Sequence, residues 1–293
     1  MTSSNKPIVI FGEALYDCFP DGRKVPGGAP FNVAWNLQAF GASPFFVSAV
    51  GQDAMGAELK EMALNWGLAV HGIQHTPEHA TSTVQVELDE GAPSYTIVEN
   101  TAMDQIKVPA ILSYDSDSIL YHGSLAVRSD ASMESLRSIR EQWKGPVFVD
   151  VNIRKPWFDA QRFAALLTGV HYLKVNDEEF EQLSGERLSK ERMEAQVAAF
   201  AKRFEIRTLI LTCGKEGAYW YEDRLGLIGV PAHLGEPMVD TVGAGDAFAS
   251  VCLLGIQLEL RPQDILKRAS AFAGKVCTIR GATSSDQAFY DLV

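Results

Sequence analysis

Residues 240–246 read Asp-Thr-Val-Gly-Ala-Gly-Asp and stand directly before an apolar segment of helical length that starts near Ala247. The glycines allow a tight backbone turn. The free N–H groups of the first helical turn then point outward, with the helix dipole behind them. Such a turn holds a phosphoryl group, and an aspartate in it meets the attacking hydroxyl. We interpret Gly243, Ala244 and Gly245 as a phosphate-binding turn and Asp246 as a catalytic base; an ordinary first-turn helix acid is the alternative.

The rest of the chain alternates short apolar runs with amphipathic stretches of helical length. This alternation is typical of a parallel sheet between two layers of helices. We therefore predict the α/β class, as a three-layer sandwich with a central, mostly parallel sheet. The predicted strands are Ile8–Phe11, Phe45–Ala49, Ile119–Tyr121, Val147–Val151, Tyr172–Val175 and Leu209–Thr212.

One region interrupts the alternation. Thr83–Leu88 and Tyr95–Val98 read as two strands around the turn Asp89–Pro93, with no helix between them. Because such a hairpin does not fit easily into a parallel sheet, we expect it to project as a lid. We predict one domain over residues 1–293, with a small β lid formed around residues 12–25 and 80–101. The exposed edge of the hairpin is also disposed to pair in a homodimer.

The composition limits the possible partners. Acidic residues outnumber basic residues 37 to 26, which gives a formal charge of −11. We therefore expect neither nucleic acid nor an anionic membrane as a partner, although backbone amides can still bind a phosphorylated ligand. The polar start and the shortness of the apolar runs predict no signal peptide and no membrane span, so we expect a cytoplasmic protein. The four cysteines lack the close spacing of metal or redox sites.

Two other kinds of site are not expected. His71, His75 and His79 recur every four residues, but Gly72 and Pro77 interrupt any helix that would align them, so we expect no zinc site there. The chain also lacks a Gly-x-x-x-x-Gly-Lys-Ser/Thr run, which excludes a P-loop nucleotide site at the level of sequence motifs.

Two further runs add to the turn at 240–246. Residues 12–17 read Gly-Glu-Ala-Leu-Tyr-Asp, and residues 27–34 read Gly-Gly-Ala-Pro-Phe-Asn-Val-Ala. In this order, the three runs resemble the signatures of the ribokinase-like (PfkB) carbohydrate kinases. The resemblance implies an ATP-dependent sugar kinase in which Asp246 is the base and Asp17, Gly28 and Asn32 bind the sugar. Taken alone, Asp17 also fits a turn and Asn32 a helix surface.

The resemblance extends to the nucleotide. Residues 176–179 read Asn-Asp-Glu-Glu and resemble the family's Asn-x-x-Glu motif, which implies that Glu179 holds Mg²⁺ through water. Residues 211–218 resemble its adenine-nucleotide loop. Read without the family, these runs are a helix start rich in acids and a turn between strands. The implied nucleotide-binding residues are Asn176, Thr212, Gly214, Gly217, Gly243 and Gly245.

The substrate is indicated by two further features. Residues 150–154, Asp-Val-Asn-Ile-Arg, resemble the segment that brings an arginine to the substrate in fructokinases and in 2-keto-3-deoxygluconate kinases, which implies Arg154 as a substrate residue. A surface ion pair is the alternative. The first signature, Gly-Gly-Ala-Pro-Phe-Asn, favours fructose over ribose. Alternatives are a keto-deoxy acid sugar, another sugar or a nucleoside, and, from a different class, a catalytically silent sugar-binding regulator.

The resemblance also implies a K⁺ site beside the phosphate-binding turn. Its ligands would come from Asp240, the carbonyl of Val242 and the segment around Gly281. Oxygen atoms of this kind are suitable ligands for a hard cation.

Overall fold

The computed structural model describes residues 7–89, 92–112 and 116–291. Its main sheet has nine strands in the order β13-β12-β11-β10-β9-β8-β1-β4-β5. Neighbouring strands from β5 to β11 pair in parallel, whereas β12 and β13 pair antiparallel at one edge. The strands are β1 (Ile8–Phe11), β4 (Phe45–Gly51), β5 (Ile73–Thr76), β8 (Ile119–His122), β9 (Val147–Asp150), β10 (Tyr172–Asn176), β11 (Thr208–Thr212), β12 (Ala218–Glu222) and β13 (Gly226–Val230). The six strands predicted from the sequence are confirmed.

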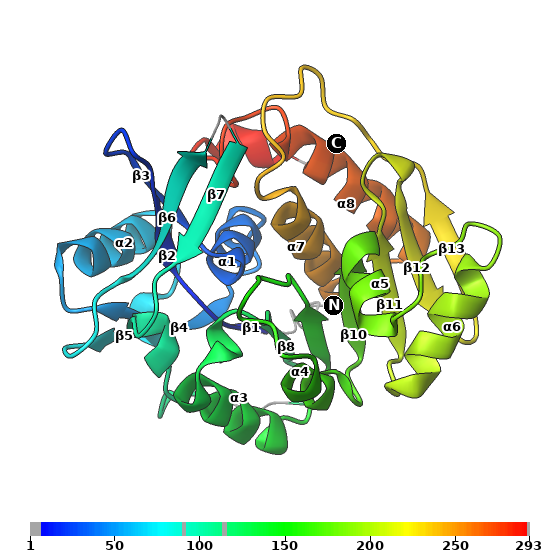
Figure 1. The fold of residues 1–293 in the computed structure, drawn as a ribbon, viewed down its shortest axis with the longest axis horizontal. Coiled ribbons are helices and arrows are strands. Elements are labelled where there is room, and N and C mark those ends of the chain that lie inside the picture. The colour runs from blue at the N-terminus through cyan, green and yellow to red at the C-terminus, as the bar shows by residue number, and fades with distance from the viewer. Residues whose placement is uncertain (1–6, 90–91, 113–115, 292–293) are drawn as a thin grey trace, which may run out of the picture.

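Helices cover both faces of this sheet, as Figure 1 shows. Along β1, Ile8 and Ile10 are buried against one helical layer, and Val9 and Phe11 against the other, because successive side chains of a strand point to opposite faces. The three-layer sandwich is thus confirmed. The first layer contains α1 (Ala29–Ala39), α2 (Ala54–Asn65), α7 (Ala244–Gln257) and α8 (Pro262–Val276). The second contains α3 (Asp130–Gln142), α4 (Ala160–Leu167), α5 (Asp177–Ser184) and α6 (Met193–Arg203).

A second, four-stranded sheet has the order β3-β2-β6-β7. Its strands are β2 (Leu15–Cys18), β3 (Lys24–Gly27), β6 (Ser82–Asp89) and β7 (Ala92–Ile97). In Figure 1 this small sheet lies on the side of the molecule away from β12 and β13. The predicted hairpin is confirmed as β6 and β7, and β2, which lies within residues 12–25, pairs in parallel with β6. Residues 90 and 91 of the predicted turn lie outside the described residues.

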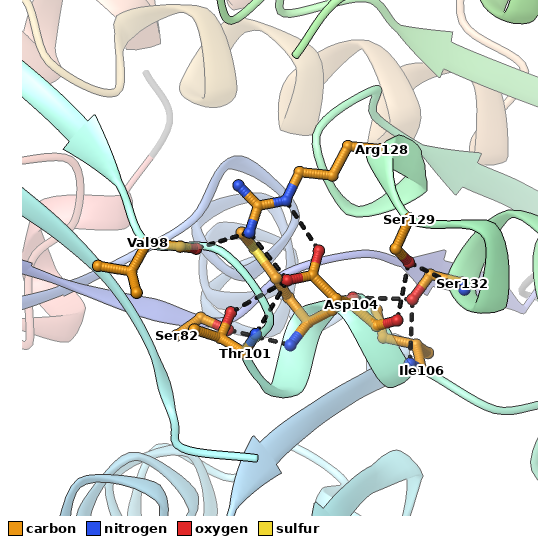
Figure 2. A network of polar contacts seen from close by, with 9 residues as sticks. Ser82, Val98, Thr101, Asp104, Ile106, Arg128, Ser129 and Ser132 are labelled. Carbon is orange, nitrogen blue, oxygen red and sulfur yellow. Dashed lines mark hydrogen bonds and ion pairs between the residues drawn. The ribbon is translucent and has the colours of Figure 1, made fainter. Parts of the chain in front are cut away.

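A buried polar network joins both ends of the β6–β7 hairpin to the main body (Figure 2). Arg128 donates through Nε and Nη2 to the two carboxylate oxygens of Asp104, at 2.8 and 2.9 Å, and through Nη2 to the carbonyl of Val98 at 2.6 Å. Thr101 donates its N–H to Asp104 at 3.0 Å and accepts a hydrogen bond from Ser82 at 2.9 Å. Ser82 begins β6 and Val98 follows β7, so the network fixes both feet of the hairpin.

Short 3₁₀ helices complete the fold: η1 (Val70–Gly72), η2 (Ala102–Gln105), η3 (Ala126–Arg128), η4 (Gly214–Glu216) and η5 (Gln287–Tyr290). Because His71 lies in η1 and His75 in β5, these histidines do not share a helix. In the described part of the chain, no group of three or more His, Cys, Asp or Glu side chains is arranged to hold a metal ion. None of its helices is long and apolar enough to span a membrane.

Candidate active site

The predicted phosphate-binding turn forms the start of α7. Gly243 precedes the helix with a left-handed φ of 78°, and a Cβ added to it would lie 2.3 Å from the Cβ of Ala282, so the position requires glycine. Gly245 has no such conformation and lies within the first turn of the helix. The N–H of Ala244 donates to the carbonyl of Thr241 at 3.3 Å. The amides best placed for an anion are therefore those of Gly245 and Asp246, which have no partner within the helix.

Asp246 and Asn32 meet at the centre of the site. The Nδ2 of Asn32 donates to Oδ2 of Asp246 at 2.8 Å, which joins α1 to α7. Burial raises the pKa of Asp246 to about 7; the carboxylate of Asp150 adds to the rise, while Asn32, Lys174 and Arg154 oppose it. A carboxyl group that titrates near neutral pH is well matched to accept a proton in general-base catalysis.

The predicted sugar-binding residues lie at the junction of β1, the small sheet and α1. Gly28 has a φ of 103°, and a Cβ on it would lie 2.7 Å from the carbonyl oxygen of Glu13, so only glycine fits. A Cβ on Gly27 would lie 3.1 Å from Oδ2 of Asp17, which shows how closely that carboxylate approaches the glycine pair. Burial raises the pKa of Asp17 to about 6, and the charge of Arg154 opposes the rise.

Carboxyl groups outnumber cations in this part of the site. Burial raises the pKa of Glu13, Asp17, Asp150 and Asp246, and the positive charge of Arg154 opposes each rise, so the arginine is close enough to act on all four. Burial nevertheless leaves the pKa of Glu13 raised. The side chain of Arg154 itself is exposed and donates to the carbonyl of its neighbour Ile153 at 3.1 Å.

The Asn-x-x-Glu motif forms a reciprocal cap at the start of α5. Asn176 accepts the N–H of Glu179 at 2.8 Å, and Glu179 Oε2 accepts the N–H of Asn176 at 2.9 Å. The other carboxylate oxygen of Glu179 accepts the N–H of Ile153 at 2.8 Å. Glu179 therefore fixes both its own helix start and the loop that carries Arg154. Each of its oxygens has a second lone pair, so the carboxylate still suits an Mg²⁺ ion that is contacted through water.

The predicted adenine-nucleotide loop lies next to this cap. Thr212 pairs in register with Asn176 at the ends of β11 and β10. Gly214 begins η4, and Gly217 takes a φ of 110° at the start of β12. The strand-like reading of the residues after this loop is confirmed by β12.

The predicted K⁺ residues are also brought together. The two carboxylate oxygens of Asp240 accept the N–H of Val242 at 3.0 Å and the N–H of Gly281 at 3.1 Å. Asp240 thus connects the segment before α7 to the loop after α8.

A comparison with known protein families decides the assignment. Residues 8–288 match the model of the pfkB family carbohydrate kinases. The chain belongs to this family. As a carbohydrate kinase, it is an enzyme that phosphorylates a sugar, and the family resemblance of the sequence motifs is confirmed.

The relatives of this carbohydrate kinase include fructokinases. It is 30% identical to the fructokinase of Escherichia coli over 265 residues, which cover 85% of this chain and 84% of the relative. The structure of Vibrio cholerae fructokinase with fructose, ADP and calcium ion superposes with a TM-score of 0.82 at 25% identity, covering 99% of both chains. Aminoimidazole riboside kinase from Salmonella enterica shares the fold, with a TM-score of 0.77 at 23% identity over 98% of this chain and 96% of the other.

Two charged residues of the kinase site were assigned no role from the sequence. Lys174 lies between Leu173 and Val175 in a strand that is otherwise largely buried, and Asp150 ends the neighbouring strand. Their signal in the sequence is a charged residue inside an apolar strand, which is costly unless a partner lies beside it. Only the register of β9 and β10, which sets Lys174 opposite Asp150, identifies that partner.

Proposed function

We propose that this carbohydrate kinase is a fructokinase, which transfers the γ-phosphoryl group of ATP to the 6-hydroxyl of fructose. The observation that carries the proposal is the Asn32–Asp246 hydrogen bond at the start of α7. It sets a carboxyl group with a pKa of about 7 beside amides that suit a phosphoryl group. The fructokinase relatives support fructose as the acceptor, and a fructokinase structure with bound ATP supports ATP as the donor.

Each residue of the site has a separate role in the proposed reaction. Asp246 accepts the proton of the sugar hydroxyl as its oxygen attacks the γ-phosphorus, and the bond to ADP breaks. The amides of Gly245 and Asp246 stabilise the equatorial oxygens. Asn32 orients the Asp246 carboxylate, and Asp17 binds sugar hydroxyls. Mg²⁺, with Glu179 as its water-mediated anchor, would neutralise charge on the leaving diphosphate.

The charges of the site favour a neutral sugar over a sugar acid. Four carboxyl groups, those of Glu13, Asp17, Asp150 and Asp246, lie within the field of Arg154. A substrate carboxylate would add a further negative charge to this cluster, and like charges at close range repel. We therefore favour fructose over 2-keto-3-deoxygluconate. The base at position 246 and its phosphate-binding turn also argue against a silent regulator.

The test is an ADP-release assay with purified protein, ATP and Mg²⁺ over fructose, glucose, ribose, adenosine and 2-keto-3-deoxygluconate. We expect kcat/KM for fructose to exceed that for each other acceptor by at least about tenfold. A higher value for the keto acid would contradict the charge argument. A higher value for adenosine would assign the chain to the nucleoside kinases of the same fold.

We further propose that the small sheet is a lid over the sugar and that it pairs with a second copy. Its edge strands are β3 and β7, and Tyr95 on β7 is 58% exposed. Unpaired strand edges favour pairing between chains. Light scattering should then give twice the 32.1 kDa mass of one chain, and a monomer at micromolar concentration would remove the dimer.

We also propose a K⁺ ion beside the phosphate-binding turn, held by Asp240, the carbonyl of Val242 and the loop at Gly281. The observation that supports it is the junction that Asp240 forms between these two segments. Rates measured in potassium, sodium and choline buffers test it. Equal rates in the three buffers would exclude an activating ion.

A further inference from the structure

A buried ion pair joins two central strands of the main sheet. The Nζ of Lys174 on β10 donates to both carboxylate oxygens of Asp150 on β9, at 2.8 and 2.9 Å. The two residues are only 5% and 2% exposed. Burial lowers the pKa of Lys174, but the charge and hydrogen bonds of Asp150, together with the charges of Glu179 and Asp246, outweigh it, so the pKa is raised and the side chain is a cation. Two buried charges are costly to keep in a core.

The ammonium group faces the phosphate-binding turn. A Cβ added to Gly245 would lie 3.7 Å from Nζ of Lys174, and Lys174 is the one side chain that this added atom would meet among the described residues. Lys174 also acts electrostatically on Asp246. The cation therefore lies next to the same helix start whose amides face outward, on the side toward β9 and β10.

An ammonium group carries three N–H donors. Lys174 directs its bonds at Asp150, and within residues 7–89, 92–112 and 116–291 no hydrogen bond to a second acceptor is found. An ammonium fixed by one carboxylate thus keeps a donor for an anion that is not part of the chain.

We propose that Lys174 is a further catalytic residue, a cation that binds the transferred phosphoryl group, and that Asp150 is the positioning residue that holds it there. This inference rests on the proposed kinase function. Phosphoryl transfer spreads negative charge over the equatorial oxygens, and a fixed charge in a site from which water is excluded stabilises that state strongly. The sugar oxygen bonds to phosphorus, the bond to ADP breaks, and the hydroxyl proton passes to Asp246. Lys174 keeps its protons throughout.

The local charges explain why a cation is needed. A phosphoryl group entering the turn meets the carboxyl groups of Asp150 and Asp246, both of which repel it. Arg154 is exposed, so Lys174 is the buried cation available to the phosphoryl group among the residues described.

The experiment compares neutral replacements of two buried ion pairs. The variant Lys174→Met/Asp150→Asn removes both charges together, which avoids leaving one buried charge unpaired. We expect this variant to unfold in a thermal transition like that of the wild type and to keep its KM for sugar within about threefold. Its kcat should fall by about 10²–10³. Asp150→Asn alone, which keeps the cation but loosens it, should lose about tenfold. The matched control is Arg128→Met/Asp104→Asn, which removes the buried pair at the foot of the proposed lid. Its effect should fall on the KM for sugar, while kcat at saturating sugar stays within about threefold of the wild type.

A second readout does not depend on turnover. Titration calorimetry should show that the Lys174→Met/Asp150→Asn protein binds ADP normally but has lost the tighter binding of ADP with aluminium fluoride and sugar, which mimics the transferred phosphoryl group. A folded double variant with near-normal kcat and unchanged binding of this mimic would overturn the inference. If the wild type prefers another sugar, the fructose proposal fails, and the same comparison is made with that sugar.

Discussion

The described part of the chain contains two buried ion pairs that differ in how many hydrogen bonds their carboxylates accept. Asp104, at the foot of the small sheet, accepts two bonds from Arg128 and one from the N–H of Thr101. Asp150, in the site, accepts both of its bonds in the described structure from the single ammonium of Lys174. A carboxylate that several donors from different segments bind is held rigidly, whereas a carboxylate with spare bonding capacity is characteristic of functional sites.

The surroundings of the two cations differ in the same way. Arg128 lies over the ring of Trp157, 4.6 Å from its centroid, and also binds the carbonyl of Val98. Lys174 instead faces Gly245, where no side chain intervenes. The comparison teaches that burial and ion pairing alone do not separate structural charges from catalytic ones. The surroundings of the remaining donor do: among the described residues, Nη1 of Arg128 has no hydrogen-bond partner and its guanidinium lies over Trp157, whereas Nζ of Lys174 faces the phosphate-binding turn.

The largest expected effect is at Asp246, the proposed proton acceptor beside the Lys174–Asp150 pair. Asp246→Asn should lower kcat by about 10²–10⁴, with little change in sugar affinity, because the amide cannot accept the hydroxyl proton. Steady-state kinetics at saturating ATP measures this loss. Near-full turnover would reduce Asp246 to a helix-start residue.

The same variant should be more stable than the wild type. The Asp246 carboxyl ionises near pH 3.8 when exposed and near 7 when folded, so its ionisation costs stability progressively as pH rises through that window. At pH 8 we expect Asp246→Asn to gain about 2–4 kcal/mol in unfolding free energy, since each pKa unit is worth about 1.4 kcal/mol. Urea unfolding at pH 4 should show little gain.

The next effect concerns the structural pair. Arg128→Met leaves Asp104 buried without its cation and should lower the free energy of unfolding by about 3–5 kcal/mol. Denaturant unfolding measures the loss, and kcat under conditions where the variant is folded should stay within about threefold. A large fall in kcat at full folding would erase the distinction between the two pairs.

A smaller effect is expected in the pH dependence of kcat/KM. The wild type should lose activity as pH falls through about 7, because protonated Asp246 cannot act as a base. Asp150 raises the pKa of Asp246, so Asp150→Asn should move this acidic limb to lower pH by about 0.5–1 unit. Asp104→Asn, the matched change in the other pair, should leave the limb in place.

The smallest effect should come from the ring over Arg128. Trp157→Leu removes a cation–π contact and should cost about 0.5–2 kcal/mol of unfolding free energy. Guanidinium unfolding of Trp157→Leu and of Arg128→Met, measured under the same conditions, shows how much of the stabilisation by Arg128 comes from its contact with the ring. A cost equal to that of Arg128→Met would mean that the ring, and not Asp104, holds the arginine.

Much of the fold follows from short-range patterns. The apolar runs that became β1, β4, β8, β9, β10 and β11, and the hairpin that became β6 and β7, carry their periodicity in the sequence. The antiparallel edge formed by β12 and β13 was foreseen only as a strand-like run after the nucleotide loop. Pairing partners of strands depend on contacts between distant segments, which no local pattern contains.

The sequence by itself predicted the class of the fold, the glycine turn at Gly243 and Asp246 as the candidate base, because each follows from local residue patterns. Only the tertiary structure decided what surrounds the base. Asn32 and Asp246 are 214 positions apart yet share a hydrogen bond. Lys174 became a candidate catalytic cation only when the register of the sheet set it against Asp150 and beneath Gly245. Burial and electrostatic fields arise from segments that meet in space, so a pKa or a charge partner exists only once the chain is folded.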